Sequence, residues 1–325
     1  MTDAQLARLI AQHTARMQPA MARAWLKTVD LLKQSLSADE IAQLIERGQI
    51  DAILSDAVID RALIPFREEL HGATRDGFRL SVPLLPRAGL IDGIVGIGFD
   101  VLNPRVRRAL EELESQILTT AKVEVRETVR QAIAAGVELG QHPRAIARGV
   151  RDVIGLAPNQ AEAVRNFEKA LRAGDWAKIK GYKLRDKTVG PRLAKGKPNP
   201  KVPLTEDQIT RMVKAYRRRF EAFHAETVTR TATLNAYRTG QHEAFAASIE
   251  SGMVDRARAM KTWVNVGDSR VRDLHLNTST LHPTSVGGET VPFDARFSNG
   301  LLYPSEWNCR CHVRYWQRPA FSAAA

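Results

Sequence analysis

The chain lacks the features that mark secreted disulfide-rich proteins. Its 325 residues include two cysteines, Cys309 and Cys311, with one residue between them. Cysteines this close rarely bridge each other, so the sequence excludes a disulfide framework. The scarcity of cysteine fits a protein that assembles in a reducing cytosol. The N-terminus has no apolar signal core, which argues against export by a signal peptide.

The chain also lacks a hydrophobic run suited to a membrane. The most apolar long stretch, residues 80–102, is interrupted by Arg87, Asp92 and Asp100, and by two prolines and four glycines. A spanning helix needs about 20 mainly apolar residues with few charges. We therefore expect a buried loop or docking segment here and no membrane partner.

Acidic residues are scarce relative to basic ones. The sequence has 36 Asp or Glu against 48 Lys or Arg, a formal charge of +12. Such a surplus favours an acidic partner, most simply nucleic acid, although an ordinary basic surface remains an alternative.

The length and the 44% hydrophobic content support a folded core and at least two domains. The predicted fold class is mainly α with a small α+β C-terminal domain. The expected segments are an N-terminal helical docking region (1–71), a Gly/Pro-rich connector (72–103), a helical scaffold (104–174), a basic linker and helix (175–219) and the C-terminal α+β domain (220–325).

Local patterns predict several helix boundaries. Ser37 to Glu40 has the spacing of a capping box. Asn103 and Pro104 have the N-cap and first-turn preferences of a long helix. Its apolar stripe is Val106, Leu110, Leu113, Ile117, Ala121, Val125, Val129 and Ile133. Two shorter helices follow, over 144–153 and 158–173. A DNA-reading helix-turn-helix is an alternative for this pair, but the second helix has few basic residues for entering the major groove.

Most of the excess charge lies in residues 175–219, which hold fourteen Lys or Arg against four acids. The first half has little periodicity, so we expect a mobile or partner-ordered loop. The second half, from Leu204, is predicted to be a capped helix ending at the run of arginines 217–219. One interpretation is a solvated linker, and the other is a segment that contacts DNA phosphates or docks on an acidic protein surface. The candidate nucleic-acid-binding residues are Lys178, Lys180, Lys183, Arg185, Lys187, Arg192, Lys195, Lys197, Arg217, Arg218 and Arg219.

The last hundred residues carry an ordered set of motifs. A predicted helix over 221–249 contains Arg-Thr, a strand with Lys-x-Trp follows, then Asp-x-Arg-x-Arg-x-x-His, and finally Asn-Cys-Arg-Cys. The residues are Arg230, Thr231, Lys261, Trp263, Asp268, Arg270, Arg272, His275, Asn308, Cys309, Arg310 and Cys311. This order and spacing resemble the C-terminal domain of phage head morphogenesis proteins, the Mu F-like or SPP1 gp7-like minor head family. The resemblance is clearest over residues 222–316.

The resemblance implies a structural minor capsid protein of a tailed phage, bound inside the head near the portal. Its implied partners are the portal protein, the major capsid or scaffolding protein, and genomic DNA. Its implied location is the capsid interior of the virion, after assembly in the host cytoplasm. The motif residues are then structural, and no catalytic residue is assigned.

The C-terminal motifs also permit a chemical interpretation. Asp268 is expected to cap a short helix that begins at Ser269. Alternation along residues 309–316 places both cysteines on one strand face, where they serve as small core residues. The competing interpretation is structural zinc held by His275, Cys309 and Cys311, with His282 or His312. The one-residue cysteine spacing falls outside the usual zinc pattern, so we expect no cofactor.

Two other functions remain open. One is a basic DNA-binding protein packaged or ejected with the genome. The other is a metal-dependent hydrolase or effector domain. Its acid–base groups would come from Asp268, Asp273, His275 and Glu289. The chain has no nucleophile motif, phosphate-binding glycine loop or HExxH sequence, so an enzyme is not expected.

Overall fold

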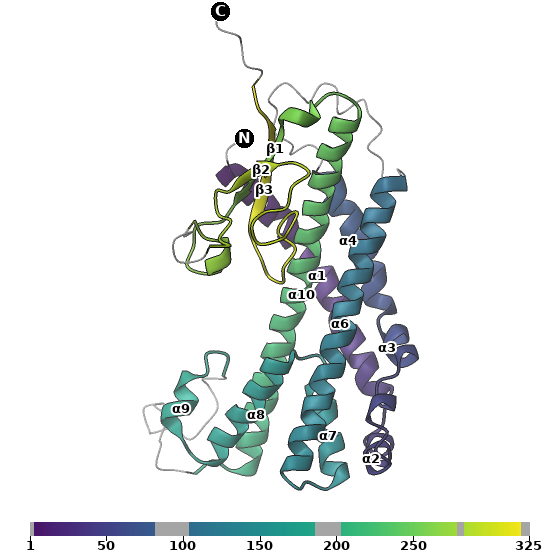
Figure 1. Ribbon diagram of the computed structural model, residues 1–325. Helices are drawn as coiled ribbons and strands as arrows, with labels where there is room; N and C mark the ends of the chain where they lie inside the picture. The colour runs from purple at the N-terminus through teal and green to yellow at the C-terminus, as the bar shows by residue number, and fades with distance from the viewer. Residues whose placement is uncertain (1–2, 82–103, 186–202, 278–282, 320–325) are drawn as a thin grey trace, which may run out of the picture. The chain divides into compact units, whose positions relative to one another are not determined.

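The computed structural model describes residues 3–81, 104–185, 203–277 and 283–319. The fold is mainly helical with one small sheet near the C-terminus (Figure 1), which confirms the predicted class. The helices are α1 (Asp3–Gln34), α2 (Ala38–Glu46), α3 (Asp56–Ala62), α4 (Ile64–Ser81), α6 (Pro104–Glu138), α7 (Pro143–Val153), α8 (Pro158–Arg172), α9 (Trp176–Gly181) and α10 (Glu206–Glu250). Short 3-10 helices are η1 (Ile50–Ala52), η3 (Arg256–Arg258) and η4 (Asp273–His275). The strands are β1 (Ala259–Val264), β2 (Thr290–Pro292) and β3 (His312–Gln317).

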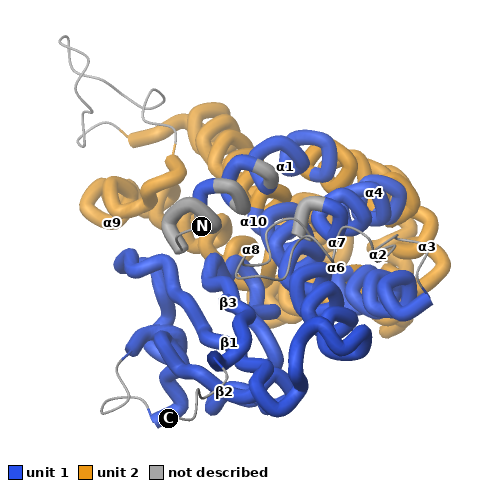
Figure 2. The backbone as a smooth tube through the Cα atoms, turned by 90° about the horizontal axis from the view of Figure 1, so that it is seen from above, with its two compact units in different colours: residues 1–21, 67–117, 227–325 blue, residues 22–66, 118–226 orange. Residues whose placement is uncertain are grey.

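The chain forms two compact units (Figure 2). Unit 1 comprises residues 1–21, 67–117 and 227–325, and unit 2 comprises residues 22–66 and 118–226. Each unit draws on several of the segments expected from the sequence. Helices α1, α4, α6 and α10 each contribute residues to both units.

Local sequence rules set several boundaries as expected. The Ser37 hydroxyl accepts from the Glu40 N–H, and the Glu40 carboxylate accepts from the Ser37 N–H, which completes the predicted capping box. Helix α6 begins at Pro104, while Asn103 lies outside the described residues. All eight members of the predicted α6 stripe are buried. Helical periodicity therefore identified the face of α6 that packs.

Two expected boundaries are wrong. The Gly/Pro-rich connector was expected to begin at residue 72, but α4 continues to Ser81. We expected one helix to end near residue 219 and another to begin at 221, but α10 is continuous over 45 residues. Its start is fixed by Thr205 and Gln208, which exchange side-chain and backbone hydrogen bonds. No glycine or proline interrupts the chain from there until Gly240, so the run of three arginines stays helical.

Unit 2 has an aromatic core that joins α8, α9 and α10. The Phe167 ring lies 4.4 Å from Tyr216 and 5.0 Å from Tyr182 between centroids, and Phe220 stacks edge-on against Tyr216. Ile179 of α9 is fully buried in the same cluster. The expectation of a loop in the first half of the basic segment is therefore wrong for residues 176–181. These few apolar side chains suffice to hold a short helix against the core.

Unit 1 has a small antiparallel sheet in the order β2-β1-β3. Met260 of the central strand lies opposite Pro292 on one side and Trp316 on the other. The strands lie beside the C-terminal half of α10 (Figure 1). Phe245 of that helix packs in one core with Trp263 and Tyr315 of the sheet. The sheet thus buries one face on the helix.

Every helix in the described ranges is too short or too polar to span a bilayer.

Gly155 lies in the turn between α7 and α8, where unit 2 leaves no space for a side chain. It adopts φ +93°, and an added Cβ would meet a Val29 methyl at 2.6 Å. We expect Gly155→Ala to lower the free energy of unfolding by about 1–3 kcal/mol more than Gly140→Ala. Gly140 also has a positive φ, +61°, but an added Cβ there meets nothing within 4 Å. Urea unfolding followed by circular dichroism measures the difference, and equal losses would contradict it.

Candidate functional site

The motif residues of the C-terminal hundred meet in unit 1. They come from α10, β1, the turn after β1 and the segment that leads into β3. Their contacts form one continuous polar and sulfur-containing network, which we call the motif network. It extends from Arg230 of α10, through residues 308–311, to Asp268 and His275. The sequence separates these residues by up to about eighty positions, so only the tertiary fold brings them together.

Arg230 and Thr231 hold Asn308 in place. The Arg230 guanidinium donates to the Asn308 side-chain oxygen at 3.0 Å, and the Thr231 hydroxyl accepts from the Asn308 N–H at 2.9 Å. Asn308 has φ +55°, a left-handed conformation that asparagine tolerates better than most residues. This turn directs the two following cysteines back toward the helix. The Arg-Thr and Asn-Cys motifs are therefore two halves of one contact.

Asp268 holds Arg310 from the other side. The Arg310 guanidinium donates to the Asp268 carboxylate at 2.6 Å, and the Arg270 N–H also donates to it. The bond from Arg310 keeps the pKa of Asp268 well below its usual range. The expected helix at Ser269 is absent: residues 268–270 form a turn, because the carboxylate satisfies the Arg270 N–H and the Asp268 carbonyl accepts from Val271.

Arg238 of α10 lies at the centre of the network, and sequence reasoning missed it. Its buried guanidinium donates to the backbone carbonyls of Cys309 and Cys311 at 2.6 to 3.1 Å, and to the Asn235 side chain. Burial lowers the pKa of this guanidinium. A signal was present, because Arg238 follows Thr231 by seven residues and so occupies the same helix face. Because charged residues occur throughout the sequence, this spacing alone did not single out Arg238.

His275 and both cysteines form a buried cluster. The Nδ1 atom of His275 lies 3.6 Å from the Cys309 sulfur and 3.8 Å from the Cys311 sulfur. The opposite ring nitrogen, Nε2, lies 2.7 Å from the carboxylate of Glu306, a contact that sequence reasoning also missed. Among the described residues, His275, Cys309 and Cys311 form the group whose possible ligand atoms lie close enough together to hold a metal ion.

The pKa of each thiol depends on the other thiol. A hydrogen bond from Cys311 lowers the pKa of the Cys309 thiol, and the bond to Cys309 raises the pKa of the Cys311 thiol. One negative charge on the pair is therefore accommodated more readily than two. As expected from strand alternation, Cys309, Cys311, Val313 and Tyr315 are all buried. His312 is an exception on the other face, because it is buried as well.

The Lys-x-Trp motif lies in β1 and is fully buried. The Lys261 ammonium lies 5.3 Å from the Phe297 ring centroid and 5.8 Å from that of Phe293. Its nitrogen has no hydrogen-bond partner among the described residues, and burial lowers its pKa to about 8. Trp263 packs edge-on against Phe297 and lies 4.9 Å from the His275 ring. The tryptophan thus forms one wall of the cysteine cluster.

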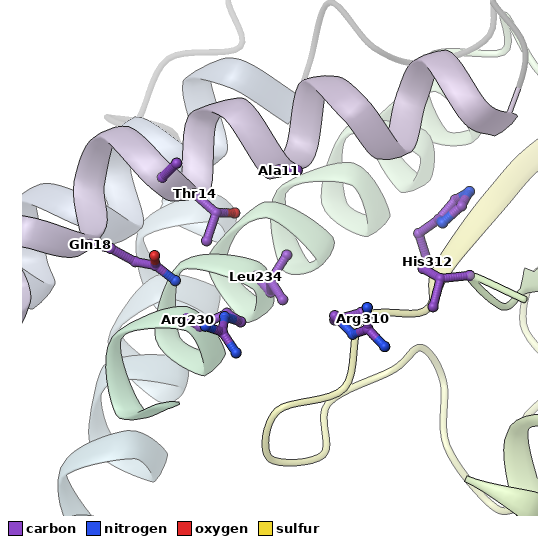
Figure 3. Close-up of a pocket in the computed structure, with 9 residues that line it drawn as sticks. Ala11, Thr14, Gln18, Arg230, Leu234, Arg310 and His312 are labelled. Atoms are coloured by element: carbon purple, nitrogen blue, oxygen red, sulfur yellow. The ribbon is translucent and has the colours of Figure 1, made fainter. Parts of the chain in front are cut away.

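Figure 3 shows a pocket beside the motif network, between α1 and α10 within unit 1. Its volume is about 260 Å³. Arg230, Arg310 and His312 line its polar side, while Ala11 and Leu234 supply apolar wall. The two arginines are already bonded to Asn308 and Asp268, so their guanidinium groups serve the network as well as the pocket.

Two arginines of the basic segment bond to other parts of unit 2, and most of the other described cations of the segment are exposed. Arg217 forms an ion pair with Asp152 at 2.5 Å, and Arg219 donates to the carbonyls of Leu184 and Arg185. These two arginines therefore help to hold unit 2 together. Lys178, Lys180, Lys183 and Arg218 are exposed, and Arg185 is half-buried. The other candidates, Lys187, Arg192, Lys195 and Lys197, lie outside the described residues, as does His282.

Comparison with known proteins gives no relative. No protein-family model, no curated protein and no solved structure matches this chain.

The buried Lys261 predicts an unusual pH dependence of stability. Its pKa in the folded chain, about 8, lies below the ordinary 10.5, so between these values the unfolded chain binds more protons. The free energy of unfolding should therefore rise with pH across this window. Lys261→Met should remove that rise and, at neutral pH, stabilise the protein by on the order of 3 kcal/mol. Urea unfolding of both proteins from pH 7 to 10.5 tests this, and an unchanged slope in the variant would contradict it.

Proposed function

We propose that the protein is a structural minor capsid protein of a tailed phage, bound inside the head near the portal. The observation that carries the proposal is the motif network. Each motif in the resemblance to head morphogenesis proteins has a partner in another motif. Arg-Thr contacts Asn308, Asp268 contacts Arg310, and His275 contacts the cysteines and Trp263. A set of residues that is shared because it maintains a scaffold should interlock in this way.

The chemistry of the network also favours a structural role. Its charged groups position the chain: Arg238 binds backbone carbonyls, Arg272 binds the Trp307 carbonyl, and Asp268 binds Arg310. A general acid or base needs a proton-transfer group that a substrate can reach, whereas His275 is 2% exposed. The proposed work of the protein is therefore binding to the portal and to the capsid or scaffolding protein.

The proposal predicts that the protein is part of the virion. Particles of the encoding phage, purified on a density gradient and treated with DNase, should contain the chain in far fewer copies than the major capsid protein. The chain should also co-purify with the portal protein when the two are expressed together. A tail protein from the same phage is the matched negative partner. Absence from the particles together with failure to bind the portal would refute the proposal.

A second candidate, binding of genomic DNA, is favoured by one observation in unit 2. Lys178, Lys180 and Lys183 are exposed on and just after α9, and Arg218 is exposed on α10. Arg219 of α10 bonds to the backbone at residues 184 and 185, so these two elements lie in contact. A cluster of exposed cations is suited to phosphate groups.

This candidate predicts a salt-dependent affinity that the cluster controls. Changing Lys178, Lys180, Lys183 and Arg218 together to Gln should weaken binding to duplex DNA. The slope of log affinity against log salt should fall by about 0.9 for each DNA phosphate that the variant no longer neutralises. Changing Lys27, Arg47, Arg61 and Arg108, which are exposed elsewhere, alters the net charge equally and serves as the control. Fluorescence anisotropy over a range of salt measures the slopes, and an equal weakening in both variants would count against a defined binding face.

A further inference from the structure

We propose that His275, Cys309 and Cys311 bind one zinc ion, through Nδ1 of the histidine and the two cysteine sulfurs. The ion would join the η4 turn to the segment that enters β3. This inference does not depend on the proposed role in a phage head, because it concerns only the side chains inside unit 1.

The distances within the cluster match a shared tetrahedral ion. With zinc–sulfur bonds of about 2.3 Å and zinc–nitrogen bonds of about 2.05 Å, a tetrahedral angle places sulfur and nitrogen about 3.6 Å apart. Nδ1 of His275 lies 3.6 Å from one sulfur and 3.8 Å from the other. All three ligand atoms lie within 4.8 Å of one another. Bringing them to bonding distance of a single ion thus needs little movement.

The backbone explains how a Cys-x-Cys pair can serve. Spacings of two or more intervening residues suit turns, but alternation in an extended segment places residues i and i+2 on one side. Cys309 and Cys311 have this arrangement, and both side chains are buried. Arg238 binds the carbonyls of both residues, which fixes the segment. The sulfurs are therefore held in position before an ion arrives.

The histidine is oriented as a metal ligand. The Glu306 carboxylate lies 2.7 Å from Nε2, so that nitrogen carries the proton and donates a hydrogen bond to the carboxylate. Nδ1 then presents its lone pair to the sulfurs. Carboxylates on the remote nitrogen of metal-bound histidines set the ring and its tautomer in this way. The close approach of Gly287 to the His275 carbonyl, 2.7 Å from an added Cβ, leaves the turn little freedom to move away.

Space and charge also fit the ion. A pocket of about 90 Å³ is lined by all three ligands together with Asn308 and Arg310. It has room for the ion and for a water molecule as the fourth ligand. Two thiolates cancel the charge of a divalent ion, so the occupied site carries no net charge beside the neighbouring arginines. Thiolate and imidazole ligands favour zinc over magnesium or calcium.

The experiment measures metal in the full chain, purified without a metal-affinity step. Elemental analysis should find about one zinc per chain. Replacement by cobalt(II) should give the near-ultraviolet thiolate-to-cobalt charge-transfer band and the visible bands of tetrahedral cobalt. Removing zinc with a chelator should lower the thermal midpoint, and adding zinc back should restore it. A folded chain with less than about 0.1 zinc per chain, and no charge-transfer band after cobalt addition, would overturn the proposal.

Variants separate the ligands from their surroundings. Cys309→Ser and His275→Gln should lose most of the zinc. His242→Gln is the matched control, because His242 is a half-buried histidine of the same unit that stacks on Phe293. Glu306→Gln should keep the fold and weaken zinc affinity by about 10- to 100-fold. Glu289→Gln, which removes a carboxylate bonded to Ser298, should not change affinity. Equal zinc affinity in the Glu306 and Glu289 variants would contradict the assigned histidine geometry.

Discussion

The C-terminal part of unit 1 depends on one buried guanidinium. Arg238 lies in α10 with 2% of its surface exposed and donates to the carbonyls of Cys309 and Cys311. Those carbonyls lie just before β3, outside the residues that pair with β1. Without Arg238 they would be buried acceptors lacking a donor, at a cost of about 1–3 kcal/mol each. The guanidinium thus supplies the hydrogen-bond donors that a neighbouring strand would otherwise supply. It also fixes the position of the two cysteines relative to His275.

The rest of the network follows from that anchor. Once the segment is bound to α10, Asn308 must turn through a left-handed conformation, and Arg230 and Thr231 of the same helix stabilise the turn. Arg310 then points toward Asp268, which draws the loop after β1 over the cluster. Charged side chains here add to the apolar core that the sheet forms with α10, because three short strands alone are seldom stable.

Charge in unit 2 is used in a different way. The run of arginines at residues 217–219 looks uniform in the sequence, but the helix turns each one to a different direction. Arg217 pairs with Asp152, Arg219 binds the carbonyls of Leu184 and Arg185 at the surface, and Arg218 is exposed. Part of the positive charge therefore stabilises the unit, while most of the described cations of this segment are exposed to solvent.

The sequence by itself determined what depends on neighbours within a few residues. The structure confirms four features that follow from local geometry. They are the capping box at Ser37, the buried stripe of α6, the two short helices expected over 144–153 and 158–173, and the burial of alternate residues from Cys309 to Tyr315. Only the tertiary structure decided the rest. It joined two expected helices into α10, folded α9 onto an aromatic core, and replaced the helix after Asp268 by a turn. It alone placed Arg238 and Glu306 beside the motifs, because helix spacing sets Arg238 on the face of Thr231 but does not show which distant residues that face contacts.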